Sequence, residues 1–326
     1  MKFSLLLSAL PNDSWTLARQ IGVTHAVTKA APQLTGLPAP DDLSSLRAIS
    51  DSFAQHGIKL AGLEGDQFDM SRIKRGEPGR DEDIERYQKM LRNMGEVGIP
   101  LLCYNFMPRA KNAEHDWHRT DCRVPLRGGS LSTAFDLKEL PPSSDLEFSQ
   151  EDLWENYRYF IQAVIPTAEE VGVKMALHPD DPPLPSLGSV PRIFNHPEAW
   201  MRAFDLAPSA SSGVTFCQAN FLLMGVDIEY WARFFAEIGK LFFVHIRDVE
   251  GVSEKFTEVW HDEGPTDLSA MLKLYHELGF SDLIRDDHVP SMLGEQPDMP
   301  GYGMLGHLYT VGYLKGLLKA QKIPYA

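Results

Sequence analysis

The sequence predicts an α/β fold, a (β/α)8 TIM barrel with long loops at the C-terminal face. Two observations lead to this prediction. A helical stretch that ends in glycine and runs into an apolar strand recurs along the chain, for example at Gly22, Gly57, Gly98 and Gly172. Glycine is favoured just past a helix C-terminus because it enters the left-handed region without penalty. Eight strand-and-helix units follow one another without a dividing linker, so we expect one barrel domain over residues 1–326 rather than an open doubly wound sheet.

The predicted strands are short apolar runs, too short for helices. In chain order they are residues 2–7, 24–28, 59–63, 100–106, 174–178, 214–218, 241–246 and 282–286. The first lies in an N-terminal segment that resembles a signal peptide. Its apolar core is brief and Pro11 follows it closely, so we interpret it as a barrel strand.

The segments between these strands have helical periodicity. Leu43, Leu46 and Phe53 stand at helical spacing, and Ile84, Leu91 and neighbouring residues repeat the pattern. Further helices are predicted at residues 15–21, 153–171, 197–204, 228–238, 268–278 and 307–319. The apolar part of the last one, residues 309–318, suits a barrel helix, a homo-oligomer interface, or both.

Two segments depart from the repeat. Residues 108–150 and residues 286–303 are long and irregular, and both leave from the C-terminal ends of predicted strands. Active sites of TIM barrels are built at that face, so we expect these segments to be active-site loops.

The composition excludes some classes of function. The formal net charge of −14, from 31 basic and 45 acidic residues, argues against a nucleic-acid partner. No apolar run approaches the length of a membrane span. The 3 cysteines are odd in number and form no CxxC pair, which is typical of a reduced compartment. We therefore expect a cytoplasmic protein that acts on a small molecule.

The strand ends carry metal-ligand types. His178, Cys217, His245 and either Asp286 or Asp287 follow four consecutive strands. Each alone is most simply a buried structural residue, but imidazole, thiolate and carboxylate at one level of a barrel predict a divalent metal site. The residues alone leave zinc, iron and manganese open.

Other polar residues near the strand ends suit an anionic polyol substrate. The predicted substrate contacts are Arg285, Asn105, Gln218, Arg119 and Asp180. Arg285 can pair with a carboxylate in bidentate fashion, and His288 and Tyr302 can move protons. The two amides could instead satisfy backbone groups, Arg119 could belong to a solvated loop, and Asp180 could simply set a turn with Asp181. The cluster at residues 261–264 is interpreted mostly as a turn.

Several longer motifs carry a family resemblance. They are Cys-Tyr-Asn-Phe-Met-Pro at 103–108, Trp-His-Arg-Thr-Asp at 117–121, His-Pro-Asp-Asp-Pro-Pro at 178–183, Phe-Cys-Gln at 216–218, Arg-Asp-Asp-His at 285–288, and Pro-Gly-Tyr-Gly at 300–303 with Gly306 and Gly312-Tyr313 after it. With these motifs the sequence resembles the D-mannonate dehydratase family of the xylose-isomerase-like TIM barrels.

The resemblance implies a lyase of hexuronate degradation that dehydrates D-mannonate to 2-keto-3-deoxy-D-gluconate with Mn2+ or Fe2+. It implies metal ligands His178, Cys217, His245 and Asp287, where the family's Arg-x-Asp-His pattern selects Asp287 over Asp286. Arg285, His288 and Tyr302 would then bind substrate and transfer protons, with Asp287 among the catalytic candidates.

The sequence also departs from the family pattern. The departures include residues 7–14, Ala219-Asn220 after the Cys-Gln pair, Ile246-Arg247-Asp248, residues 285–290, and His307. They leave open a related aldonate as substrate. They also leave open a sugar isomerase or epimerase with Glu64 as an extra base, and a non-catalytic sugar-acid sensor.

Overall fold

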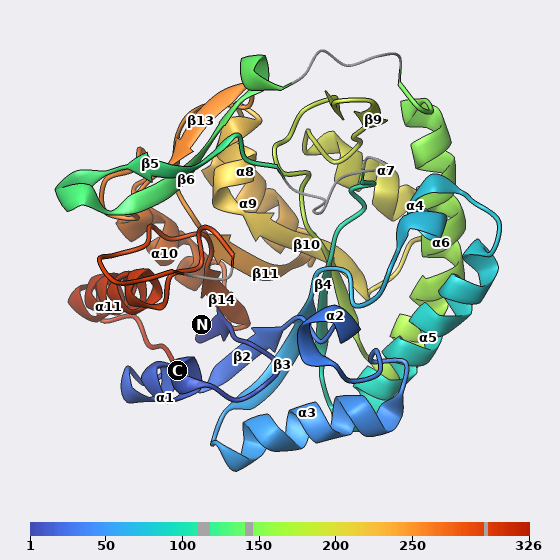
Figure 1. Ribbon diagram of the computed structural model, residues 1–326, viewed down its shortest axis with the longest axis horizontal. Coiled ribbons are helices and arrows are strands. Elements are labelled where there is room, and N and C mark those ends of the chain that lie inside the picture. The colour runs from blue at the N-terminus through green and yellow to red at the C-terminus, as the bar shows by residue number, and fades with distance from the viewer. Residues whose placement is uncertain (110–117, 141–145, 297–298) are drawn as a thin grey trace.

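The computed structural model describes residues 1–109, 118–140, 146–296 and 299–326. Within these residues, eight parallel strands close into a barrel in the order β1-β14-β11-β10-β7-β4-β3-β2 (Figure 1). The strands are β1 (Lys2–Leu6), β2 (His25–Thr28), β3 (Lys59–Glu64), β4 (Leu101–Tyr104), β7 (Lys174–Leu177), β10 (Ser212–Cys217), β11 (Leu241–Ile246) and β14 (Leu283–Asp286). Each overlaps a predicted strand, so the predicted TIM barrel is confirmed.

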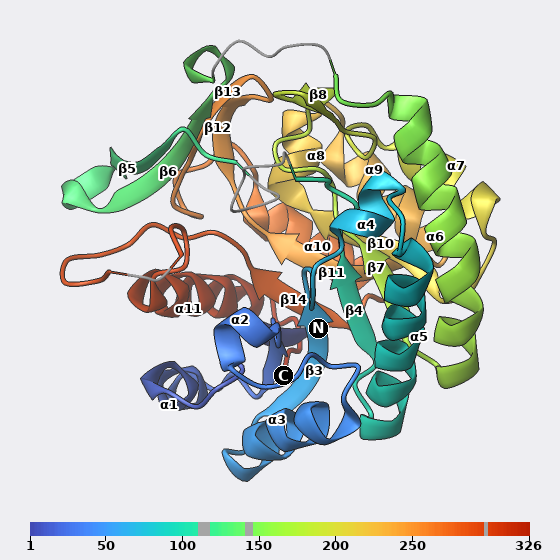
Figure 2. The same ribbon diagram turned by 45° about the vertical axis from the view of Figure 1, so that its right-hand side comes forward.

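Helices cover the outside of the barrel (Figure 2). They are α1 (Asp13–Gln20), α3 (Leu43–Gln55), α5 (Arg80–Val97), α6 (Gln150–Val171), α7 (Glu198–Leu206), α9 (Ile228–Glu237), α10 (Leu268–Glu277) and α11 (Met304–Ala320). Gly98 and Gly172 end α5 and α6 at φ 81° and 69°, as the glycine junctions predicted. Shorter helices lie in the connections: α2 (Pro32–Thr35), α4 (Ser71–Arg75) and α8 (Gln218–Leu223).

Strand register brings the polar strand ends to one level. Cys217 pairs with His245 across β10 and β11, and His245 pairs with Arg285 across β11 and β14. On the opposite wall of the barrel, Glu64 pairs with Cys103 across β3 and β4. Because all eight strands are parallel, these side chains meet at the C-terminal end of the barrel.

The long segment at residues 108–150 is not irregular throughout, and that prediction is wrong for its described part. It holds β5 (Asp121–Pro125) and β6 (Leu131–Asp136), with 3-10 turns at Arg127–Gly129 and Leu137–Glu139. These strands join β12 (Val249–Val252) and β13 (Lys255–Glu258) in an antiparallel sheet of order β12-β13-β6-β5. Because β5 is polar and exposed and β6 pairs with a strand far along the chain, no local apolar alternation marks them.

Two smaller features complete the described fold. A short hairpin, β8 (Ser186–Leu187) and β9 (Val190–Pro191), follows the motif at residues 178–183. Helix α11 packs on the barrel through Val311, Leu314 and Leu318, so it is a barrel helix, and its part in an oligomer stays a prediction. Among the described residues, no helix has both the length and the apolar character to cross a membrane.

Candidate metal centre

The structure brings the four predicted ligands together. His178 follows β7, Cys217 ends β10, His245 belongs to β11, and Asp287 follows β14. Each contributes one ligand atom, and these atoms all lie within 4.8 Å of one another. Three of the side chains are buried and His178 is partly buried. The arrangement therefore offers imidazole, thiolate and carboxylate donors around one point.

The two oxygens of the Asp287 carboxylate face different groups of side chains. Oδ2 lies 3.6 Å from His245 Nδ1 and 3.9 Å from Cys217 Sγ. Oδ1 accepts hydrogen bonds from Arg285 Nη2 at 2.9 Å and from the Tyr302 hydroxyl at 3.0 Å. These bonds engage Oδ1 and leave Oδ2 for a metal ion. The carboxylate of Asp286, the sequence alternative, instead interacts with His307 Nδ1 at 2.8 Å.

The two histidines present a ring nitrogen to the same point. His178 Nδ1 lies 2.7 Å from the Pro179 carbonyl oxygen, so that nitrogen carries the proton and Nε2 is left to bind. Neither ring nitrogen of His245 has a hydrogen-bond partner among the described residues, although the side chain is 1% exposed. Burial, and then the Arg285 charge, hold the pKa of His245 well below its usual value. The neutral ring is the form that binds a metal, and a metal ion would supply the partner that His245 lacks.

The Cys217 thiol completes the donor set. Burial raises the pKa of Cys217 to about 12, while the nearby Arg247 guanidinium opposes that rise. Arg247 Nη1 lies 3.8 Å from Sγ. A bound cation deprotonates a coordinating thiol, so a thiol held here without a metal is neutral and one with a metal is a thiolate. The four residues thus fit a divalent metal ion.

A network of buried charges lies beside the metal centre. Arg119 and Arg247 both bridge Asp181 and Glu258, with distances of 2.9 and 2.6 Å for Arg119 and 3.0 and 2.6 Å for Arg247. His288 Nδ1 lies 2.9 Å from Glu258 Oε1. Because Glu258 ends β13, the network joins the antiparallel sheet to the barrel.

The network sets the charge of its carboxylates. Burial alone would raise the pKa of Asp181, but Arg119 and Arg247 lower it to about 2. Burial opposes ionisation of Glu258 as well, and its interactions with Arg247, His288 and Arg119 hold its pKa well below the usual value. Sequence reasoning missed Glu258 and Arg247. Glu258 belongs to a short strand 139 residues from Arg119, and no local pattern indicates such a partner.

Arg285 has protein partners on both terminal nitrogens. Nη2 donates to Glu64 Oε1 at 2.5 Å and to Asp287 Oδ1 at 2.9 Å, and Nη1 donates to the Asp286 carbonyl at 3.1 Å. Only Nε lacks a partner in the described part of the chain. The structure as it stands therefore does not offer the paired nitrogens that the predicted bidentate contact requires, and substrate binding by Arg285 stays a prediction.

Of the other predicted substrate contacts, Asn105 and Asp180 have hydrogen-bond partners in the protein, whereas both polar side-chain atoms of Gln218 have none among the described residues. Asn105 Oδ1 accepts from Lys74 Nζ at 2.9 Å and from the Met107 amide at 3.0 Å, which includes the backbone role left open by the sequence. Asp180 accepts from the Phe194 amide at 2.7 Å, and burial raises its pKa to about 6. Gln218 is buried at the start of α8. Contact of these side chains with substrate remains a prediction.

The loop after β14 places the two predicted proton-transfer residues. His288 adopts the left-handed backbone at φ 39°, and its ring centre lies 5.1 Å from that of Tyr302. The Gly301 carbonyl, in a residue at φ 85°, accepts a hydrogen bond from the Val289 amide, and the chain thereby returns to the site. Of the motif at 117–121, Trp117 lies outside the described residues, and His118 to Asp121 lead into β5.

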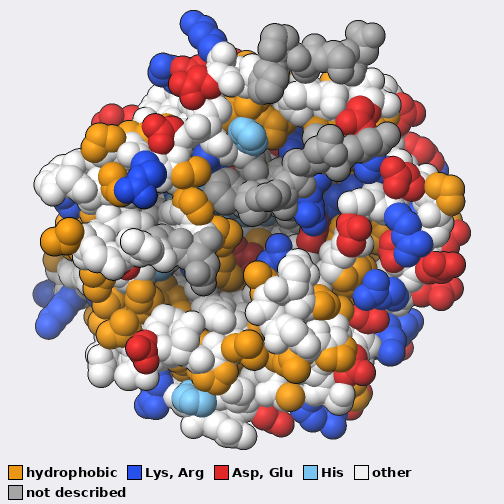
Figure 3. Space-filling view, viewed as in Figure 1, with side chains coloured by type: hydrophobic (Ala, Val, Ile, Leu, Met, Phe, Trp, Pro, Cys, Tyr) orange, Lys and Arg blue, Asp and Glu red, His pale blue; other side chains and the backbone are white. Residues whose placement is uncertain are grey.

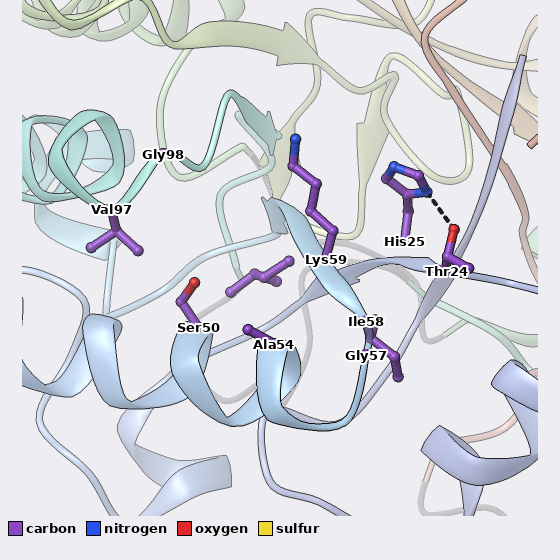
Figure 4. Close-up of a pocket in the computed structure, with 10 residues that line it drawn as sticks. Thr24, His25, Ser50, Ala54, Gly57, Ile58, Lys59, Val97 and Gly98 are labelled. Atoms are coloured by element: carbon purple, nitrogen blue, oxygen red, sulfur yellow. Dashed lines mark hydrogen bonds between the residues drawn. The ribbon is translucent and has the colours of Figure 1, made fainter.

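The face seen in Figure 3 is hollowed near its centre, between charged side chains of both signs. A separate depression, lined by Thr24, His25, Lys59 and Gly98 among others, lies at the starts of β2, β3 and β4 (Figure 4). It is at the amino end of the barrel, away from the predicted ligands.

The cluster at residues 261–264 forms a turn, as expected, and His261 Nε2 lies 2.8 Å from the Ile246 carbonyl oxygen.

The fold and this centre define a class of protein, a TIM barrel able to hold a divalent metal ion where its strands end. Comparison with known proteins narrows the class. The sequence profile of the D-mannonate dehydratase (UxuA) family matches residues 12–148 and 143–325. The chain therefore belongs to the D-mannonate dehydratase family.

Individual relatives support this family assignment. A mannonate dehydratase of Streptococcus pneumoniae is 36% identical over 308 residues, which cover 85% of this chain and 82% of that protein. The crystal structure of mannonate dehydratase from Streptococcus suis serotype 2 matches with a TM-score of 0.87 and 31% identity, over 100% of this chain and 97% of that one. A 3-keto-D-glucoside 4-epimerase of E. coli, at a TM-score of 0.63 and 11% identity over 97% of this chain and 99% of that one, shares the fold alone.

Proposed function

We propose that this protein is a metal-dependent hydro-lyase that converts D-mannonate to 2-keto-3-deoxy-D-gluconate, with Mn2+ or Fe2+ held by His178, Cys217, His245 and Asp287. Family membership supports the reaction. The observation that carries the proposal is the meeting of those four ligand atoms within 4.8 Å, directly beside the Tyr302 hydroxyl. When bound, the metal ion supplies positive charge that stabilises the negative charge developing on the substrate carboxylate.

Tyr302 suits the role of the acid. Its hydroxyl donates to Asp287 Oδ1. Burial, and then the charge of Asp287, raise the pKa of Tyr302 well above its ordinary value, so the hydroxyl keeps its proton at neutral pH. It can give that proton to the hydroxyl that leaves from the carbon beta to the carboxylate, which departs as water.

His288 suits the role of the base. Its Nδ1 lies 2.9 Å from Glu258 Oε1, which can accept a hydrogen bond from that nitrogen. Nε2 lies on the side of the metal centre, 3.7 Å from Asp287 Oδ1. It can take the proton alpha to the carboxylate. The electron pair of that C–H bond forms the enol double bond as the beta hydroxyl leaves, and the enol becomes the 2-keto product.

The direct test is incubation of purified protein with D-mannonate and Mn2+ or Fe2+ and detection of a 2-keto-3-deoxy acid. Asp287→Asn, which removes a predicted ligand charge, is the inactive control. Product formation without added or bound metal would contradict the metal dependence. Absence of product with either metal, from protein shown by elemental analysis to be loaded, would contradict mannonate as substrate, and a panel of related aldonates would follow.

An isomerase or epimerase remains the second candidate, because Glu64 lies at the same barrel end as the metal centre. The products of the two reactions differ in mass. Dehydration removes one water from the substrate, whereas isomerisation conserves the mass, so mass spectrometry of the product distinguishes them.

A further inference from the structure

A carboxylate on the opposite wall of the barrel has no part in the reaction proposed above. Glu64 ends β3, and its Oε1 accepts from Arg285 Nη2 at 2.5 Å. Its Oε2 has no hydrogen-bond partner among the described residues and lies 3.7 Å from His245 Nε2. The Glu64 side chain is only 14% exposed, so water satisfies little of this oxygen.

His245 has two ring nitrogens that face two different carboxylates. Nδ1 lies 3.6 Å from Asp287 Oδ2, within the group of four predicted ligands, and Nε2 faces Glu64. A neutral imidazole that gives Nδ1 to a metal ion must carry its proton on Nε2. That buried N–H then needs an acceptor, and Glu64 Oε2, an unpartnered oxygen 3.7 Å from Nε2, can serve.

A second metal ion is the competing use of this carboxylate. Glu64, Cys103 and His245 also offer ligand atoms that lie within 4.8 Å of one another. The guanidinium of Arg285 already neutralises Glu64 at 2.5 Å. A further cation placed there would face that positive charge in a buried setting, so the geometry favours a hydrogen-bonding role for Glu64.

We propose that Glu64 is a positioning residue that acts through His245: Oε2 accepts a hydrogen bond from Nε2–H when Nδ1 binds the metal ion, while Oε1 holds Arg285 beside Asp287. One carboxylate thereby links the metal ligand His245 to the Arg285 guanidinium. This inference rests on the metal site of the proposed function and not on its substrate or reaction. Carboxylates that orient a ligating histidine typically change metal affinity about 10–100-fold when they are removed.

The test is the Mn2+ affinity of the chelator-stripped protein, measured without substrate by competition with a fluorescent indicator. Glu64→Gln keeps the length of the side chain but removes its charge, and we expect affinity to fall at least about tenfold. Asp66→Asn is the matched control, because Asp66 is a buried carboxylate close to the end of the same strand that pairs with Lys74 at 2.8 Å. The control should leave Mn2+ affinity close to that of the unaltered protein.

The outcomes separate the two proposals. Unchanged Mn2+ affinity in a natively folded Glu64→Gln would overturn the role of Glu64 and leave the proposed function standing. Failure of the unaltered protein to bind Mn2+ would overturn the metal site itself.

A second measurement needs no variant. Long-range proton–nitrogen NMR of the unaltered protein loaded with diamagnetic Zn2+ should show His245 protonated at Nε2 and metal-bound at Nδ1. Metal bound at Nε2 would overturn the proposal.

Discussion

The Tyr302 hydroxyl donates a hydrogen bond to Asp287 Oδ1 at 3.0 Å, and Oδ2 of the same carboxylate faces the predicted metal ligands. We therefore expect Tyr302→Phe to lower kcat by roughly 10²–10⁴-fold, because it removes the proposed acid and retains the ring. Mn2+ affinity should change little, because no ligand is altered. Steady-state kinetics and metal titration of the same preparation check both expectations.

Isotope exchange distinguishes Tyr302 from His288. In D2O, Tyr302→Phe should still exchange the proton alpha to the carboxylate of unreacted D-mannonate, because the proposed base is intact. His288→Gln should lose both exchange and turnover. NMR of the recovered substrate measures the exchange of this proton for deuterium. If His288→Gln exchanges that proton at the rate of the unaltered protein, His288 is not the base.

Metal affinity should rise with pH. Burial raises the pKa of Cys217 to about 12, so over neutral pH the thiol loses a proton when a metal ion binds. We expect the association constant for Mn2+ to increase about tenfold per pH unit between roughly pH 6.5 and 8.5. Cys217→Ser should bind more weakly and with a shallower slope. Cys122→Ser, at an exposed cysteine, is the control and should match the unaltered protein, whereas an equal slope in Cys217→Ser would contradict proton release from this thiol.

The buried charge network should stabilise the docking of the antiparallel sheet. Arg119→Met leaves Asp181 and Glu258 with one guanidinium in place of two, and we expect a loss of about 3–5 kcal/mol in the free energy of unfolding. Arg127→Met, in the connection between β5 and β6, breaks a half-exposed pair with Asp262 and should cost about 1 kcal/mol or less. Urea unfolding measures both. Equal losses in the free energy of unfolding would show that the buried Arg119 pairs stabilise the fold no more than the half-exposed Arg127 pair.

Asp180 should make stability depend on pH with a defined sign. Burial raises its pKa to about 6, above the value near 3.8 of an exposed aspartate, so the folded protein holds that proton more tightly. The protonated carboxyl contributes stability below about pH 4, and that contribution is lost as pH rises through 6. Asp180→Asn should therefore gain stability relative to the unaltered protein, by on the order of 2 kcal/mol, between pH 4.5 and 7.5. Urea unfolding of both proteins at pH 4.5 and 7.5 checks this. A fall in the stability of Asp180→Asn relative to the unaltered protein over that range would contradict it.

The barrel and the positions of its polar strand ends could be predicted from local sequence. Strands such as β7 and β11 are apolar runs bounded by glycine or proline, and the C-terminal end of every parallel strand must face the same way. That rule places His178, Cys217, His245 and either Asp286 or Asp287 at one level. The choice of Asp287 over Asp286 needed the family pattern.

The partners of those residues could not be predicted in the same way. Glu258 reaches the site from a short strand, β13, that pairs on one side with the distant strand β6, and Glu64 reaches it across the barrel. Sequence spacing carries no information about such contacts, because they depend on which strands face each other after the barrel closes. The same holds for Arg285, which pairs with the carboxylates of Glu64 and Asp287 within the protein.

By itself, the sequence determined the barrel, the level of the four predicted ligands and the family, because each depends on periodicity or on residues close together in the chain. Only the tertiary structure decided which oxygen of Asp287 faces the ligands and which carboxylates lie beside His245, Arg285 and His288. The reason is physical: hydrogen bonds and ion pairs depend on distances of a few ångströms, and closure of the barrel sets these distances between residues far apart in the chain.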